Sequence, residues 1–151
     1  MYLEKFLTKD HIQLNCRAKD WKNAIAISAI PMLKAKEIEP TYVNSMQKAV
    51  EEFGPYMVLA EGFALAHAKP GPEVHSVCIS LITLDPPVEF GNDDFDPVDI
   101  LVAFGTPDPK SHINILRELG ELLNKPESFG IIRAAESNQE IISLFSAQEK
   151  S

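Results

Sequence analysis

The feature that most constrains the fold is the run of residues 98–104, which is apolar throughout except for Asp99. A strand that is apolar on both faces lies inside a sheet and needs cover on each side. Strand-like patterns are also predicted at residues 12–16, 56–60, 63–68, 75–84 and 88–90. Helix-like segments alternate with them, so we expect an α/β (or α+β) fold. It would be a single domain, with a mixed central sheet of about five strands flanked by helices on both faces.

The helices are predicted from their end residues and their apolar stripes. Asp20 is a candidate N-cap for a first long helix, in which Pro31 is expected to cause a kink or an interruption. A second helix begins near Pro40 and ends at Gly54. Its apolar stripe is expected to comprise Tyr42, Met46, Ala49, Val50 and Phe53. Ser111 is expected to cap a third helix, and shorter helices are predicted at residues 126–133 and after Ser137.

Length and charge narrow the class of protein. The 151 residues fit one domain spanning 1–151, large enough to bury a core without disulfides or a metal. A net charge of −8 disfavours nucleic acid and anionic membranes as main partners.

Cys16 and Cys78 are expected to be reduced thiols. The N-terminus is charged too early for a signal peptide and no run spans a membrane, so a cytoplasmic location is expected.

The candidate functional stretch is GFALAHAKP at residues 62–70. Alternation places Phe63, Leu65 and His67 on one side and three alanines on the other, and the following Pro-Gly-Pro stops the strand. His67 is therefore expected where a buried strand reaches the surface, with packing behind the ring and solvent in front. Such a ring suits repeated contact with a partner, and it equally suits an ordinary structural histidine.

The other histidines differ in their surroundings. His11 is expected to be exposed, and His75 to begin a strand at the surface. His112 lies in the first turn of a helix, with its ring leaning toward the packed face. Free N–H groups and the positive end of the helix dipole favour an anion there, such as a phosphoryl group. The alternative is that His112 only packs or supports the cap.

Metal and cofactor chemistry has little support in the sequence. The acidic segment 92–99 lacks the glycine and the closing glutamate of a calcium loop, and no glycine-rich phosphate loop is present. A small metal-dependent hydrolase that uses His67, His75 and His112 with an aspartate stays open as an alternative. Apart from that alternative, we expect no cofactor and no metal.

Several motifs together resemble one family. GPYMVLA precedes GFALAHAKP, and FDPVDILVAF and DPKSHINILRELGELL follow it in that order. This arrangement resembles the IIA component of the bacterial sugar phosphotransferase system, in its fructose/mannitol superfamily, and most of all the ascorbate-type branch. The resemblance extends from about residue 3 to residue 145.

The resemblance implies a phosphotransferase component in which His67 is phosphorylated. His67 would take a phosphoryl group from phospho-HPr and pass it to a cysteine of the cognate IIB protein, serving a membrane IIC transporter for ascorbate or a related sugar. His112 matches the second histidine, which hydrogen-bonds the phosphoryl group. Ala66 stands where many relatives have proline. No position matches the arginine of the mannitol-type branch, and Lys69 is a candidate electrostatic substitute.

Two questions stay open at this stage. The first is the role: a regulatory module with the same fold, whose phosphorylation controls another protein, is the alternative to a transport role. The second is the oligomeric state, for which a homodimer is one option. The geometric expectation is definite: His67 and His112 should lie within side-chain reach of each other at a shallow surface depression.

Overall fold

The computed structural model describes residues 2–149, in which one mixed sheet is the central element. Its five strands follow the order β1-β4-β5-β3-β2. They are β1 (Ile12–Cys16), β2 (Val58–Ala60), β3 (Phe63–Ala66), β4 (Cys78–Val88) and β5 (Val98–Gly105). β5 lies in the middle, parallel to β3 and antiparallel to β4, while β1 is parallel to β4 and β2 is antiparallel to β3. The predicted mixed sheet with its apolar central strand is confirmed.

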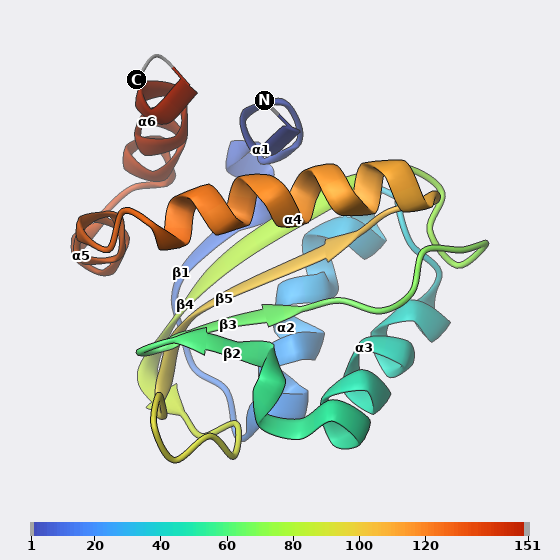
Figure 1. Cartoon of the computed structure of the whole chain (residues 1–151), viewed down its shortest axis with the longest axis horizontal. Helices are drawn as coiled ribbons and strands as arrows, with labels where there is room; N and C mark the ends of the chain where they lie inside the picture. Colours follow the sequence, from blue (N-terminus) through green and yellow to red (C-terminus); the bar gives the residue numbers. More distant parts are fainter. Residues whose placement is uncertain (1, 150–151) are drawn as a thin grey trace.

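Helices cover both faces of this sheet (Figure 1). On one face lie α2 (Trp21–Lys34) and α3 (Pro40–Phe53). On the other lie α1 (Tyr2–Phe6), α4 (Pro109–Leu123), α5 (Glu127–Ala134) and α6 (Asn138–Glu149). Two short 3-10 turns, Lys9–His11 and Gly54–Met57, precede β1 and β2. Among the helices within residues 2–149, none is long and apolar enough to cross a membrane.

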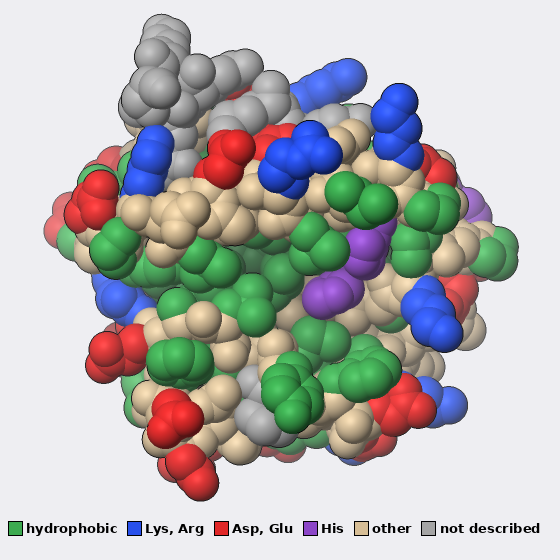
Figure 2. Space-filling model, in the orientation of Figure 1, with side chains coloured by type: hydrophobic (Ala, Val, Ile, Leu, Met, Phe, Trp, Pro, Cys, Tyr) green, Lys and Arg blue, Asp and Glu red, His purple; other side chains and the backbone are tan. Residues whose placement is uncertain are grey.

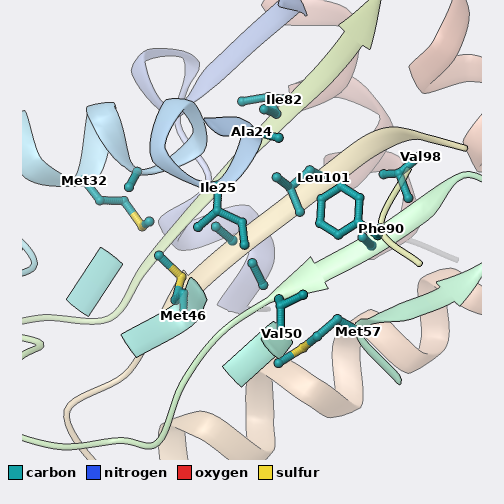
Figure 3. Close-up of a cluster of buried hydrophobic side chains, with 14 of the residues drawn as sticks. Ala24, Ile25, Met32, Met46, Val50, Met57, Ile82, Phe90, Val98 and Leu101 are labelled. Carbon is teal, nitrogen blue, oxygen red and sulfur yellow. The ribbon is translucent and has the colours of Figure 1, made fainter. Parts of the chain in front are cut away.

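The two faces of the sheet pack into two separate cores, because successive side chains of a strand point to opposite faces. Phe63 and Leu65 of β3 pack in the core beneath α4, whereas Ala64 and Ala66 pack in the core beneath α2 and α3. Figure 3 shows the second of these cores, where side chains from the two helices and the sheet converge on Leu101 of β5. The predicted alternation of residues 63–66 is confirmed, and it directs the next residue, His67, toward the α4 side.

The first long helix continues through its proline. The side chain of Asp20 accepts a hydrogen bond from the backbone N–H of Asn23 at 2.8 Å, which confirms the predicted N-cap. Pro31 has no N–H for the carbonyl of Ile27, the acceptor four residues earlier. The Nε2 amide of Gln13 donates to that carbonyl at 2.8 Å instead. Of the kink or interruption expected at Pro31, the interruption is wrong: α2 is continuous, and a side chain from β1 donates in place of the missing N–H.

Other element boundaries differ from those predicted. β4 begins at Cys78, not at residue 75, and continues past two prolines to Val88, which pairs with Val98. The register shifts between Thr83 and Val88, and a bulge is where a sheet tolerates proline. The separate strand predicted at residues 88–90 is therefore wrong, since Val88 is the last residue of β4. β2 starts at Val58, after the 3-10 turn.

Candidate active site

The candidate site lies at the carboxyl edge of the two parallel strands. The last ladder pair of β3 and β5 is Ala66 with Ala103, so His67 and Phe104 follow at neighbouring positions. α4 begins a few residues after β5, and its first turns return His112 over the same edge. Crevices outside the carboxyl ends of strands are the usual ligand sites of open α/β sheets.

Three aromatic rings form a cluster at this edge. His67 stacks on Phe104 with ring centroids 4.9 Å apart and planes 16° apart. The centroid of His112 lies 5.4 Å from that of His67 and 5.3 Å from that of Phe104. Phe104 is fully buried and packs against both imidazoles, stacked under His67 and tilted relative to His112. The predicted proximity of His67 and His112 is confirmed.

The two imidazoles each have one buried nitrogen. Nδ1 of His67 and Nδ1 of His112 are buried without a hydrogen-bond partner. The Nε2 atoms of His67 and His112 make no hydrogen bond within residues 2–149. They are also absent from the buried unpartnered atoms of that range, so they are not buried. Each Nε2 is therefore the accessible nitrogen. Buried unpaired polar atoms are uncommon in proteins and often mark sites with a chemical role.

Burial also sets the charge of the pair. The pKa of His67 is lowered from its ordinary 6.5 to about 4, first because burial penalises the charged ring and second because a charged His112 would repel it. The nearby backbone of Leu65 raises the pKa of His67 by a smaller amount. This contact lacks the geometry of a hydrogen bond, so Nδ1 still counts as unpartnered. Burial lowers the pKa of His112 as well. Both rings are therefore neutral near pH 7, and a neutral imidazole has a nitrogen lone pair available.

Both histidines line a surface depression of about 810 Å³. Lys48 and Lys69 contribute positive charge to its lining, and Glu52 and Glu73 contribute negative charge. The carboxylate of Glu73 accepts a hydrogen bond from the hydroxyl of Ser45 at 2.9 Å. The depression therefore combines two open imidazole nitrogens with charges of both signs. The predicted location of the two histidines at a surface depression is confirmed.

The start of α4 differs from the prediction. Asp108, not Ser111, is the N-cap, and its Oδ1 accepts the backbone N–H of Ser111 at 2.8 Å. Pro109, the first helical residue, has no N–H to offer. The backbone N–H of His112 donates to the carbonyl of Asp108 at 3.3 Å. The amides of Ser111 and His112 are therefore engaged within the helix start, and not free as expected.

The remaining histidines lie outside the cluster. His11 is only 8% exposed, because its Nε2 pairs with Glu37 at 2.6 Å and its Nδ1 with the hydroxyl of Thr8 at 3.0 Å. The expectation of an exposed His11 is wrong, since a distant acidic partner draws the ring inside. His75 is exposed as expected and pairs with Glu39, but it precedes β4.

Metal binding gains no support from these positions. Within residues 2–149 no group of three or more histidine, cysteine, aspartate or glutamate side chains is arranged to hold a metal ion. His75 does not line the depression that contains His67 and His112. The three histidines of the hydrolase alternative are therefore not brought together.

An apolar rim borders the depression. We use this name for the exposed side chains of Phe53, Ile113 and Leu116, of which Phe53 lines the depression and the other two follow His112 on α4. Figure 2 shows hydrophobic side chains gathered around the histidines in the middle of one face. Phe53 was expected in the buried stripe of α3, but it is 56% exposed and lines the depression. Helical spacing alone gave no signal that this last position of the stripe faces solvent.

The fold and the paired histidines define the class of protein. The family model for the phosphoenolpyruvate-dependent sugar phosphotransferase system, EIIA 2, matches residues 5–148. The chain belongs to this family, which confirms the resemblance found in the motifs. It is therefore a IIA component of that system, a phosphotransferase component.

Individual relatives agree with this assignment. The chain is 36% identical over 134 residues to the ascorbate-specific PTS system EIIA component of Escherichia coli (strain K12), covering 88% of this chain and 87% of that protein. The solution structure of the mannitol-specific cryptic phosphotransferase enzyme IIA CmtB from Escherichia coli superposes with a TM-score of 0.86 at 30% identity, covering 97% and 99% of the two chains. The mannitol IIA of Escherichia coli, solved in complex with phosphorylated IIB, shares the fold at 19% identity, with a TM-score of 0.81 and coverage of 94% and 99%.

Proposed function

We propose that His67 is the phosphoryl carrier of this IIA component. The observation that carries the proposal is the stacking of His67 on Phe104 with its Nε2 open to the depression. The Nε2 lone pair attacks the phosphorus of phospho-HPr, so that a nitrogen–phosphorus bond forms as the bond from phosphorus to HPr breaks. The same bond then breaks as a cysteine thiolate of the cognate IIB protein takes the phosphoryl group.

His112 serves in this proposal as the donor to the phosphoryl oxygens. Its ring lies beside that of His67, and its own Nε2 is accessible. Phosphoryl transfer depends mainly on alignment and on stabilising the charge of the oxygens. The roles require the proton of neutral His67 on Nδ1 and that of His112 on Nε2. Lys69, which lines the depression, supplies positive charge in place of the arginine of the mannitol-type branch.

The apolar rim provides the docking surface for both protein partners. A carrier must meet HPr and IIB in turn, so its contact area should be modest and reusable. Exposed aromatic and aliphatic side chains around the reactive ring fit that requirement. The transfer complex of IIB with a IIA domain of the same fold supports a IIB partner for this chain.

The sugar and the location follow from likeness and chemistry. Identity of 36% to the ascorbate-specific component supports ascorbate, or a related sugar, as the substrate of the membrane IIC transporter served. Two free cysteines, Cys16 and Cys78, suit a reducing compartment, which supports the cytoplasm.

The test is incubation with enzyme I, HPr and phosphoenolpyruvate, followed by mass measurement of the intact chain. The wild-type chain should gain one phosphoryl group, and His67→Ala should gain none, because the nucleophile is absent. His75→Ala is the matched control, since it removes an exposed histidine that does not line the depression. Stoichiometric phosphorylation of the His67→Ala chain would overturn the assignment.

A further inference from the structure

The backbone that carries His67 leaves the sheet at once. The β3–β5 ladder ends with the pair Ala66 and Ala103, and β3 itself ends at Ala66. His67 and Ala68 therefore have no strand neighbour to bond with, and Lys69 and Pro70 lead away into the loop. A ring that must keep one orientation is thus attached to chain that the sheet no longer holds.

A buried hydroxyl replaces the missing ladder bonds. The backbone N–H of Ala68 donates to the hydroxyl oxygen of Tyr42 at 3.1 Å. That hydroxyl donates to the carbonyl of Phe104 at 2.9 Å, and the carbonyl of Ala68 lies farther away at 3.4 Å. Tyr42 is 1% exposed, and burial raises the pKa of its phenol, so the hydroxyl keeps its proton. One side chain of α3 thereby connects the residue after His67 to the residue on which His67 stacks.

The ring of Tyr42 has little freedom to move. It packs over Gly105, the last residue of β5, where an added Cβ would lie 3.2 Å from Cε2 of Tyr42. The same Cβ would lie 3.1 Å from Val74 and 3.3 Å from the sulfur of Cys78. The missing side chain at position 105 therefore makes room for the tyrosine ring, and the surrounding contacts hold its hydroxyl in place.

We propose that Tyr42 is the positioning residue of this site: its hydroxyl fixes the backbone of His67 relative to Phe104, so that Nε2 stays aimed into the depression. The proposal rests on the proposed role of His67. Tyr42 does not line the depression, so it acts through the backbone and not on the phosphoryl group itself. Small displacements of a reacting group slow transfer steeply, because alignment supplies much of the rate.

The test variant is Tyr42→Phe, which keeps the ring and removes only the hydroxyl. We expect the rate at saturating phospho-HPr to fall by roughly tenfold to a hundredfold. The KM for phospho-HPr should stay unchanged, because the apolar rim is untouched. The amide of Ala68 should exchange its hydrogen faster than in the wild-type chain, because it has lost its acceptor.

Thr83→Val is the matched control. The Thr83 hydroxyl is also buried and also accepts a backbone N–H, that of Asn15 at 2.7 Å. Thr83 pairs with Ile100, four positions along β5 from Phe104 and so about 13 Å away. Thr83→Val removes the acceptor of one backbone N–H, whereas Tyr42→Phe removes that of the Ala68 N–H and also the donor to Phe104. Unfolding midpoints measured alongside show whether the stability losses of the two variants match. Only Tyr42→Phe should lower the saturated rate.

Three results would overturn the proposal. They are an unchanged saturated rate in Tyr42→Phe, an equal fall in Thr83→Val at matched stability, and an unchanged exchange rate of the Ala68 amide. The exchange measurement needs no phosphoryl transfer, so it tests the positioning contact even if His67 proves not to be the carrier. A wild-type chain that fails to accept phosphate on His67 would instead refute the proposed function.

Discussion

Acidification should destabilise this protein through His67. The pKa of His67 is about 4 in the folded chain, against an ordinary value of 6.5, because the ring is buried beside His112. Above pH 6.5 both the folded and the unfolded chain hold His67 neutral, and the shift has no effect. As the pH falls from 6.5 toward 4, the unfolded chain binds a proton that the folded chain refuses. Stability therefore falls across that window, and this contribution levels off below about pH 4.

The size of the effect follows from the two pKa values. Each tenfold difference in proton affinity corresponds to about 1.4 kcal/mol of free energy. The interval from 6.5 to about 4 therefore corresponds to at most about 3 kcal/mol of unfolding free energy. That is a large fraction of the roughly 5–15 kcal/mol typical of a domain. The lowered pKa of His112 acts in the same direction.

The assay is urea unfolding followed by the fluorescence of Trp21, the single tryptophan, at several pH values between 7 and 4. His67→Gln removes the titrating ring, while carboxylates shared by both chains titrate equally. The wild-type chain should lose up to about 3 kcal/mol more than His67→Gln across this range. His75→Gln shows what removal of an exposed imidazole does. Parallel stability curves for the wild-type and His67→Gln chains would refute the reasoning.

Three further predictions concern single residues. His112→Ala should slow phosphoryl uptake by about a hundredfold to a thousandfold, as loss of an oxyanion donor does, yet intact mass should still show phosphorylation after long incubation. Gly62→Ala should cost about 1–3 kcal/mol in urea unfolding, because Gly62 has φ +73° and the new Cβ would lie 2.5 Å from Nη2 of Arg133. Gln13→Ala should cost about 1–3 kcal/mol in the same assay, because it leaves the carbonyl of Ile27 without its donor.

Local periodicity accounts for what the sequence predicted well. The period of two in residues 63–66 depends only on neighbouring side chains, so it placed His67 on the α4 side correctly. The continuous apolar run of β5 likewise required cover on both faces, and helices provide it. Because β3 and β5 are parallel, the segments that follow them meet at one edge, which brings His112 to His67.

Two of the failed predictions depend on partners far away in the sequence. His11 is buried because Glu37 reaches it across 26 positions, which no local pattern contains. The uninterrupted α2 depends on Gln13, and the support under His67 depends on Tyr42 and Phe104, all from other elements. The cap of α4 failed for a local reason: Ser111 was predicted as the cap, but the helix begins at Pro109, so Asp108 takes that place.

The cap at Asp108 also shapes the chemistry of the proposed relay. Because its carboxylate takes the N–H of Ser111, its carbonyl takes that of His112, and Pro109 has none, these positions at the start of α4 offer no free amide to phosphoryl oxygens. In the proposed relay, stabilisation of the anion therefore falls mainly to side chains, namely His112 and the lysines of the depression. Such a site binds a phosphoryl group less firmly than a complete amide nest would. A carrier gains from that weakness, because a group held too tightly in the resting state would be slow to leave for IIB.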